Sequence, residues 1–369
     1  MNGQPPESRP FLSRLTLRRF RNHTSYEQDF DAGLTIFTGP NGAGKTNILE
    51  AISALNPGRG LRGAAADDMA QAPSPIGWSI EAKLDTDQKR SQIKVVYNLA
   101  TRKRLTAIDS FSETQTALAK HVRMVWLTPA MDRLWIEGAA GRRRFLDRIT
   151  LGFAPNHGEQ SALHEKAMRE RNKLLKDDDP SRAWLDAVEA RMAAHGVAIN
   201  ANRELALKSL AEAENRQSRP SEADFPIADL VLTGPLHDAP GLNENSYRER
   251  LRRDRFMDAQ AGRTLFGPHR TDLAATYRSK GVTAALCSTG EQKALLVSIL
   301  LAAAESIRRQ HGAAPVVLLD EVCAHLDPNR RCVLFQALLD LGAQCFLTGA
   351  QISDFASVSD HARILAIGN

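Results

Sequence analysis

The run "GPNGAGKT" at residues 39–46 constrains the fold of this chain more than any other stretch of its sequence. It fits the pattern G-x-x-x-x-G-K-[ST], an apolar strand pattern precedes it, and residues 47–55 follow with helical spacing of apolar positions. With ordinary residue frequencies, a chance match somewhere in a chain of this length has a probability on the order of 1%. Strand, glycine-rich turn and helix together predict a phosphate-binding loop.

We expect this loop to bind ATP through backbone N–H groups that turn inward around the phosphates. The side chain of Lys45 would reach the β- and γ-phosphates, and the hydroxyl of Thr46 would bind Mg²⁺. The helix that follows directs the positive end of its dipole at the same anion. The candidate ATP-binding residues of the loop are Gly39, Pro40, Asn41, Gly42, Ala43, Gly44, Lys45 and Thr46.

A second part of the site is predicted by "VVLLDEV" at residues 316–322. Four apolar residues of a buried strand end in Asp320 and Glu321, at the strand tip where open α/β sheets bind ligands. Asp320 would hold Mg²⁺ through water, and Glu321, the candidate catalytic residue, would polarise the attacking water. Alone, such a strand end is as often structural as functional, but beside a phosphate-binding loop it predicts a nucleotide site.

The stretch "CSTGEQKALL" resembles the signature loop of ABC-type ATPases at Ser288, Thr289, Gly290 and Glu291. "AHLDP" resembles their D-loop and contributes Asp327. Serine followed three residues later by glutamate is also an ordinary helix-capping box, and both interpretations hold together, because a signature loop aims a helix N-terminus at a γ-phosphate. In ABC ATPases that phosphate belongs to the other subunit, so the resemblance implies an ATP-dependent homodimer.

The pattern of apolar residues predicts an α/β domain assembled from both ends of the chain, with a helical insertion between them. The resemblance to ABC-type ATPases implies the fuller fold class: α/β, an ABC-type ATPase head with a P-loop α/β core and a β-subdomain, plus an inserted helical lobe. The head would be discontinuous, residues 11–130 and 262–369, and residues 131–261 would form the helical lobe. We expect strands at 11–20, 33–40, 77–86, 91–100, 123–129, 271–277, 314–322 and 343–349. We expect helices at 47–55, 161–176, 181–216, 246–260, 290–310 and 330–342.

Charge and cysteine content exclude few functions. The 48 Lys and Arg against 43 Asp and Glu give a net charge of +5, which permits a polyanionic partner without requiring one. The four cysteines form no C-x-x-C pair and fit buried thiols in a reducing cytosol. The first ten residues lack the apolar segment of a secretory signal, and the apolar run 294–304 is too short to span a membrane. We therefore expect a cytoplasmic protein with no membrane partner.

From Leu12 to the C-terminus the chain resembles the RecF family. The residues that carry the resemblance are Phe20, Arg21 and Asn22, "NGAGKTNILEAI", the run 58–62, "GRRRFLDRI", "RNKLLK" and "FGPHRTDL". The chain departs from the family pattern in reading STGEQ where many members read SRGQ, and Thr271 where an acid is usual. Thr348 stands at the switch position, where transporter ATPases carry histidine, and no Q-loop glutamine is evident near residues 126–129.

The resemblance implies a head like those of structural-maintenance-of-chromosomes proteins, without a long coiled coil, and it adds Arg21 to the candidate ATP-binding residues. It implies a weak DNA-dependent ATPase that binds double-stranded and gapped DNA and closes on it as an ATP-driven clamp. It also implies partnership with RecR and RecO, help in loading RecA, and roles in recombinational and gap repair, replication restart and the SOS response.

Basic residues are candidates for contacts with DNA phosphates, which would carry no sequence information. The first set lies on a predicted hairpin with no acid between its members: Lys89, Arg90, Lys94, Arg102, Lys103 and Arg104. The second set is Arg142, Arg143 and Arg144, which could equally stabilise the junction of the lobes or sense nucleotide. The third set, Arg248, Arg250, Arg252, Arg253 and Arg255, is interleaved with acids and is more typical of a solvated face.

Three other functions remain open from the sequence. A transporter ATPase would carry the Q-loop glutamine and the switch histidine that are not seen. A DNA-binding scaffold that binds ATP but scarcely hydrolyses it would not need Glu321. A nuclease-linked ATPase of the same superfamily would carry an appended acidic metal-binding domain, and no such segment is evident.

Overall fold

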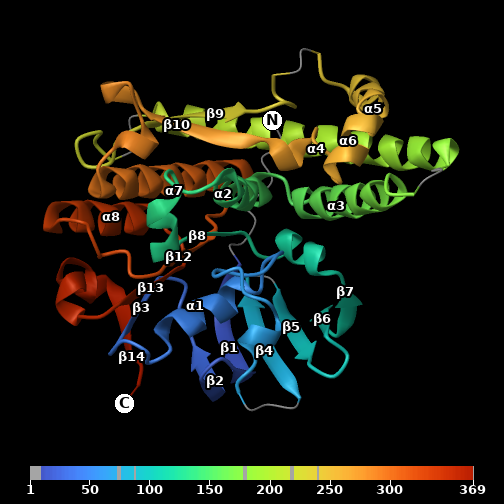
Figure 1. The fold of residues 1–369 in the computed structure, drawn as a ribbon. Coiled ribbons are helices and arrows are strands. Elements are labelled where there is room, and N and C mark those ends of the chain that lie inside the picture. The colour runs from blue at the N-terminus through green and yellow to red at the C-terminus, as the bar shows by residue number, and fades with distance from the viewer. Residues whose placement is uncertain are drawn as a thin grey trace, which may run out of the picture.

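The computed structural model describes residues 10–72, 76–86, 89–177, 181–216, 220–238 and 241–368. Two β-rich layers form the lower half of the molecule, and most of the helices lie above them (Figure 1). Residues 1–9, on which the expectation of no secretory signal rests, are outside the described residues. Within the described ranges, no helix combines the length and apolar character that crossing a membrane requires.

A five-stranded parallel sheet lies at the centre, in the strand order β14-β3-β13-β12-β8. Its strands are β3 (Leu34–Thr38), β8 (Met124–Leu127), β12 (Val316–Leu319), β13 (Cys345–Gly349) and β14 (Ala362–Ala366). Every residue of β3, β8, β12 and β13 is buried, as expected for a parallel sheet covered on both faces. This double burial explains why these strands have continuous apolar runs rather than alternation.

One face of the parallel sheet packs against a six-stranded antiparallel sheet in the order β2-β1-β4-β5-β6-β7. Its strands are β1 (Phe11–Phe20), β2 (His23–Asp29), β4 (Gly77–Asp85), β5 (Arg90–Asn98), β6 (Lys103–Ile108) and β7 (Phe111–Glu113). The interface contains Phe37, Leu318 and Phe346 of the parallel sheet, together with helix α1 (Lys45–Ser53) and the short helices η1 (Asp67–Met69) and η2 (Gln115–Lys120). This layer is the β-subdomain that the fold class predicts.

The other face of the parallel sheet is covered by helices. Ile36, Leu319 and Leu347 share a core with α2 (Ala139–Phe153), α7 (Thr289–His311) and α8 (Pro328–Leu341). The short helix η3 (Pro129–Arg133) links β8 to this layer. Because alternate residues of each strand point to opposite faces, Ile36 and Phe37 enter different cores although they are neighbours in sequence.

The helical lobe consists of α3 (His157–Leu174), α4 (Arg182–Glu214), α5 (Glu244–Arg253) and α6 (Arg255–Ala261). A small sheet in the order β11-β10-β9 lies beside α4, with strands β9 (Ala228–Thr233), β10 (Asp272–Tyr277) and β11 (Val282–Thr283) (Figure 1). The remaining short helices are η4 (Pro268–Arg270), η5 (Arg278–Lys280), η6 (Ala284–Leu286) and η7 (Ile352–His361).

A fully buried arginine ties the helices of this lobe together. Arg171 of α3 is 0% exposed and donates to Glu189 of α4 at 2.9 Å and to Asp258 of α6 at 2.6 Å. It also donates to the carbonyl of Leu251 and to the hydroxyl of Thr264. The charge is therefore compensated and each of the three guanidinium nitrogens donates a hydrogen bond, which is the condition under which a buried guanidinium is tolerated.

The fold class is confirmed, and all the expected strands and helices form with shifted ends, except one helix. The helix expected at 246–260 is wrong in its continuity: Asp254, with φ −85° and ψ 3°, separates α5 from α6. Strands β2, β6, β7, β9, β11 and β14 were not expected from the sequence. The division into residues 11–130, 131–261 and 262–369 stays a prediction, and β9 pairs with β10 across the boundary at 261/262.

We predict that Arg171→Met lowers the free energy of unfolding by about 3–5 kcal/mol, because it leaves the carboxylates of Glu189 and Asp258 buried without their cation. Urea denaturation followed by circular dichroism measures this change. Arg169→Met on the same helix is the matched control, since that side chain is 69% exposed, and it should leave stability nearly unchanged. Equal effects of the two substitutions would contradict the role assigned to Arg171.

Candidate nucleotide-binding site

The loop between β3 and α1 contains glycines where the structure leaves no room for a side chain. Gly39 has φ +145°, and a Cβ there would lie 2.2 Å from the carbonyl oxygen of Ile367. Gly44 has φ +104°, and a Cβ there would lie within 2.8 Å of the side chains of Asn22 and His23. The left-handed backbone and these close approaches explain both glycines and shape the concave loop.

Lys45 occupies the inside of the loop. Its side chain is 5% exposed, and its Nζ donates to the carbonyl oxygens of Gly39 at 2.7 Å and Pro40 at 3.1 Å. A carboxylate oxygen of Glu321 lies 3.9 Å from the same Nζ. Phosphate oxygens would offer this ammonium charge-assisted hydrogen bonds, which are stronger than those to neutral carbonyls. The structure thus places the predicted lysine where it can bind an anion held by the loop.

Asp320 joins the two parts of the predicted site. Its Oδ1 accepts a hydrogen bond from the Thr46 hydroxyl and another from the Thr348 hydroxyl, each at 2.8 Å. Thr46 and Asp320 are 274 residues apart in the chain. They meet because β3, β13 and β12 are parallel neighbours, so their carboxyl ends lie at one edge of the sheet.

Glu321 has an unusual backbone conformation for a residue with a side chain, with φ +49°. Such a left-handed residue costs about 1–2 kcal/mol and persists where its surroundings hold it. Here the amide of Glu321 donates to the hydroxyl of Thr348 at 2.9 Å. One threonine therefore holds both acids, through the amide of Glu321 and the carboxylate of Asp320.

The residues at this edge fit a magnesium ion. The Thr46 hydroxyl and the Asp320 carboxylate are hard oxygen ligands, and their 2.8 Å contact places both at one point beside the phosphate loop. In the described part of the chain, no group of three or more His, Cys, Asp or Glu forms a metal site from protein alone. Mg²⁺ commonly uses one or two protein ligands together with water and substrate phosphates, which matches this sparse set.

Arg21 lies behind the loop rather than in it. Its guanidinium makes two hydrogen bonds to the buried carboxylate of Glu50 in α1, at 2.7 and 2.8 Å, and one to the carbonyl of Asp68. Donation of these hydrogen bonds to the Glu50 carboxylate raises the pKa of Arg21. In this arrangement Arg21 fixes helix α1, and the ATP contact expected of it stays a prediction.

Two neighbours of Arg21 touch the loop directly. Asn22 donates to the carbonyl of Ala43 at 3.3 Å, and Nε2 of His23 lies 3.3 Å from the carbonyl oxygen of Gly44. Burial lowers the pKa of His23. Sequence reasoning used Asn22 only for the family resemblance and did not single out His23, and the sole signal for either was their position next to Arg21.

The signature residues lie at the exposed start of α7. Ser288 and Glu291 form the expected capping box, with the Ser288 amide donating to Glu291 at 2.8 Å. Hydrogen bonds from Lys280 and Ser288 lower the pKa of Glu291 to about 2. A Cβ on Gly290 would meet no atom within 4 Å, and Thr289 is exposed. Among the described residues, no hydrogen bond or ion pair joins this loop to the phosphate loop.

Two further residues connect the signature region to its surroundings. Asp327 begins α8 as its N-cap, accepts from the Arg330 amide at 2.9 Å and remains exposed. Lys293 of α7 is nearly buried and lies 3.5 Å from the carboxylate of Asp132 in η3, the segment that follows β8. Lys293 and Asp132 carry no motif that sequence reasoning could have recognised.

The first basic set is not free of acids in space. Arg90 pairs with Asp85 at 2.9 Å, Lys89 with Asp109 at 3.2 Å, and Lys94 with Glu81. Arg104 is largely buried over the Trp78 ring, and burial lowers the pKa of Arg104 to about 10. The acids come from β4 and from the loop after β6. The lack of acids between these basic residues in the sequence therefore did not predict an unpaired basic surface. Arg102 and Lys103 have no ion pair among the described residues.

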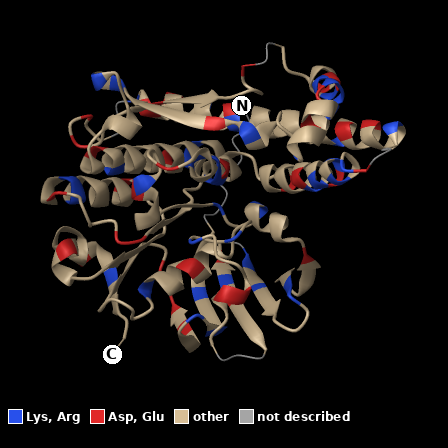
Figure 2. Ribbon diagram, viewed as in Figure 1, with Lys and Arg blue, Asp and Glu red and all other residues tan. Residues whose placement is uncertain are grey.

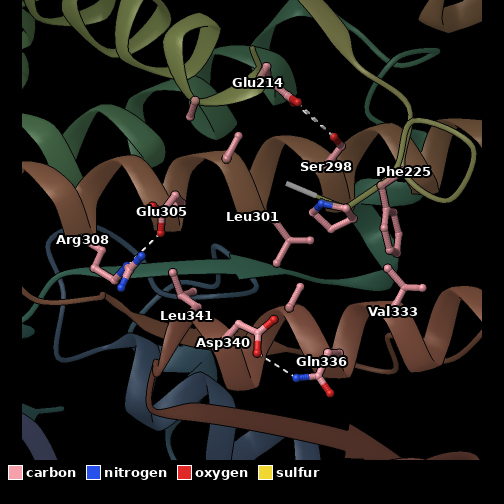
Figure 3. Close-up of a pocket in the computed structure, with 14 residues that line it drawn as sticks. Glu214, Phe225, Ser298, Leu301, Glu305, Arg308, Val333, Gln336, Asp340 and Leu341 are labelled. Carbon is pink, nitrogen blue, oxygen red and sulfur yellow. Dashed lines mark hydrogen bonds and ion pairs between the residues drawn. The ribbon is translucent and has the colours of Figure 1, made fainter. Parts of the chain in front are cut away.

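A cavity of about 440 Å³ lies away from all of these residues, between the end of α4, α7 and α8 (Figure 3). Its walls combine apolar side chains such as Phe225 and Leu301 with pairs such as Glu305 and Arg308. None of the predicted nucleotide-site residues lines it. The ammonium group of Lys45 fills the inside of the phosphate loop, so we expect no open cavity there before a nucleotide binds.

The comparisons with known proteins agree on one family. The model of the RecF/RecN/SMC N terminal domain matches residues 11–366. The chain is 42% identical over 368 residues to the DNA replication and repair protein RecF of Rhizobium rhizogenes, covering 97% of each chain. It is 42% identical over 371 residues to the protein of the same name from Brucella suis, covering 96% of this chain and 94% of the relative.

Solved structures share the fold. A structure of the recombination mediator protein RecF-ATP in the RecFOR pathway has a TM-score of 0.80 and 21% identity, covering 96% of this chain and 95% of that one. An Smc head domain with an extended coiled coil from Pyrococcus furiosus has a TM-score of 0.52 and 17% identity, covering 94% and 92%.

We predict that Thr348→Val lowers the free energy of unfolding by about 1–3 kcal/mol, because the amide of Glu321 and the carboxylate of Asp320 both lose a buried partner. Thr348→Ser retains the hydroxyl and should recover most of that loss. Chemical denaturation of the three proteins checks this, and a valine variant as stable as the serine variant would contradict the bridging role of the hydroxyl.

Proposed function

The chain belongs to the RecF family, and on this basis we propose that it is an ATP-dependent DNA-binding clamp of recombinational and gap repair. Its 42%-identical relatives are named DNA replication and repair proteins, which supports action on DNA. A RecF structure of the same fold is described with ATP, which supports ATP as the ligand of the phosphate loop.

The proposal depends most on the division of the nucleotide site into two parts. Lys45, Thr46, Asp320, Glu321 and Thr348 lie together in one chain. The signature loop lies at the surface, and open space adjoins Gly290 although its own chain does not require a glycine there. A glycine with no packing reason inside the chain suits the close approach of a ligand from outside. ATP held by one copy would therefore meet Ser288 and Gly290 of a second copy.

The residues of the site support hydrolysis by in-line attack of water. Lys45 would exchange its loop carbonyls for the β- and γ-phosphates, and Thr46 and Asp320 would hold Mg²⁺, which neutralises charge on those phosphates when bound. Glu321 would orient the attacking water and accept its proton as the bond between the γ-phosphorus and its bridging oxygen breaks. Thr348 would hold the backbone of Glu321 and the carboxylate of Asp320 in position during this step.

In this scheme ATP holds the two copies together as a dimer, and the rate of its hydrolysis sets the lifetime of that dimer. Binding joins two copies through the signature loops, and loss of the γ-phosphate removes the group that the second copy contacts. We expect slow, DNA-dependent hydrolysis, with double-stranded or gapped DNA enclosed by the dimer. The proposal also includes work with RecR and RecO, which the RecFOR pathway of the similar structure supports. It further includes help in loading RecA, roles in replication restart and the SOS response, and a cytoplasmic location.

We predict that Glu321→Gln traps the dimer. The amide cannot accept the proton of the attacking water, so ATP should persist and sedimentation should show a monomer that becomes a dimer with ATP and Mg²⁺. A gapped duplex added to the same sample should sediment with the dimer. Hydrolysis measured in parallel should fall by about 10²-fold or more.

The matched control is Ser288→Arg in the Glu321→Gln background. The arginine would fill the approach to the partner's nucleotide without touching the phosphate loop of its own chain, so ATP binding should persist while dimerisation and retention of DNA are lost. A Glu321→Gln protein that binds ATP and stays monomeric would overturn the clamp. One that dimerises but ignores DNA would leave an ATP-driven dimer of another purpose.

A further inference from the structure

The three sets of basic residues differ in how far neighbouring acids neutralise them. In the hairpin set, Lys89, Arg90 and Lys94 each face a carboxylate from an adjacent strand or loop. A cation that already has a carboxylate partner adds little to the potential felt by an approaching polyanion, because the two fields cancel beyond a few ångströms. The hairpin therefore offers at most Arg102 and Lys103 to a phosphate.

In the helical set, Arg250, Arg252 and Arg255 are neutralised in the same way, whereas Arg248 has no ion pair among the described residues. Arg250 pairs with Asp254 at 2.5 Å and Arg252 pairs with Asp186 at 2.5 Å. Arg255 pairs with Asp186 and with Glu189. Figure 2 shows basic and acidic residues intermixed on α5 and on the helices beside it. These arginines hold the helices of the lobe to one another.

The set at the junction of α2 and β10 is different. Arg142 is paired, with two hydrogen bonds of 2.8 Å to Asp272. Arg143 donates only to a neutral group, the carbonyl of Thr271, at 2.9 Å. Arg144 is exposed on the same helical turn, and Arg270 is exposed directly before Thr271. Among the described residues, Arg143, Arg144 and Arg270 have no ion pair with an acid.

Arg143 lies close enough to Arg203 and Arg270 for their charges to act on it. Burial lowers the pKa of Arg143, and the nearby charges of Arg203 and Arg270 lower it further, while the carboxylates of Asp272 and Asp147 act in the opposite direction. Arg203 is itself paired with Asp147 at 2.8 Å, so Arg270 is the uncompensated neighbour. Guanidinium groups as a class do not deprotonate near neutrality. Because Asp272 and Asp147 are already paired with Arg142 and Arg203, a bound phosphate would supply the negative charge that Arg143 and Arg270 lack.

We propose that Arg143, Arg144 and Arg270 form a contact site for backbone phosphates of double-stranded DNA at the junction of the two lobes. The proposal rests on the DNA binding proposed above and assigns it to a place. Arg270 and the two helix arginines come from segments that the hydrogen bond between Arg143 and Thr271 joins across 128 residues of sequence. The ion pair of Arg142 with Asp272 fixes α2 on β10, so the neighbouring guanidinium groups are held in position before DNA arrives.

The chemistry of the site favours phosphates over base edges. Guanidinium groups form paired hydrogen bonds with phosphate oxygens, and neutralising a phosphate releases condensed counterions from the duplex. Each such contact contributes about 0.9 to the slope of log affinity against log salt concentration. Three contacts would therefore contribute about 2.7 to that slope, with no dependence on DNA sequence.

The test compares two triple variants that each remove three positive charges. Binding of a fluorescein-labelled duplex is measured by anisotropy between about 50 and about 200 mM salt, with ATP and Mg²⁺ and in the Glu321→Gln background. For Arg143→Gln, Arg144→Gln and Arg270→Gln together, we expect the slope to fall by about 2 to 3 and Kd at about 0.1 M salt to rise on the order of 10²-fold. For Lys89→Gln, Arg90→Gln and Lys94→Gln together, we expect the slope to stay within about 1 of the parent.

Folding is checked in the same samples. Each variant should keep the thermal midpoint and the affinity for a fluorescent ATP analogue of its parent, because none of these side chains touches the phosphate loop. Should the Arg143 substitution disturb α2, the double variant Arg144→Gln and Arg270→Gln changes exposed residues only and should still lower the slope by about 2.

The outcomes separate this inference from the function on which it rests. A junction variant that folds, binds the ATP analogue and keeps the parent's slope overturns the phosphate site and leaves the clamp standing. A larger loss of slope in the hairpin variant than in the junction variant also overturns it. A parent protein that binds no duplex at any salt concentration overturns the proposed function and this site together.

Discussion

One oxygen of Asp320 accepts hydrogen bonds from the hydroxyls of Thr46 and Thr348, and the candidate site depends on that meeting. It exists only because β3, β13 and β12 are parallel and in register, with Leu319 opposite Leu347. A slip of one residue would turn Thr348 to the opposite face of the sheet and separate it from the acid pair. The burial of both faces of this sheet keeps the register, because every slipped strand would exchange the residues of two packed cores.

Ion pairs connect the helices of the helical lobe to one another and to α2. Its own apolar cluster is small, with Tyr247 and Phe266 among its few aromatic members. Buried guanidinium groups connect the helices instead, Arg171 within the lobe and Arg203 between α4, Asp147 of α2 and the carbonyl of Pro268. Such pairs contribute little net stability but penalise any arrangement that leaves one partner buried alone. They therefore set the geometry of the lobe relative to α2 and β10, and with it the place of the exposed arginines.

The basic surfaces of this protein depend on which acids and bases lie close together in the folded structure, not on their order in the sequence. The sequence offers the hairpin as its best basic surface, since no acid lies between Lys89 and Arg104. Strand pairing brings Glu81 and Asp85 beside it, because antiparallel neighbours place residues far apart in sequence opposite one another. Folding has the opposite effect on the run Arg142–Arg144 of α2: among the described residues only Arg142 has an ion pair with an acid, and Arg270 comes to lie near Arg143.

The local sequence was sufficient for the fold class, for the capping box of α7, and for the strand–turn–helix and strand-end settings of the candidate phosphate loop and acid pair, because each depends on neighbouring residues or on a regular period of apolar positions. It also placed most helices and strands, and failed at Asp254, where two amphipathic helices with one continuous pattern are separated by a single residue. Edge strands such as β2 and β7 were not predicted, because their exposed, polar residues show no alternation of apolar and polar positions. The partners of Asp320, of Arg21, and of Lys94 and Arg142 in the basic sets were decided by tertiary structure alone. Hydrogen bonds and ion pairs act over a few ångströms, and only the folded sheet and lobe bring residues that are hundreds of positions apart within that reach.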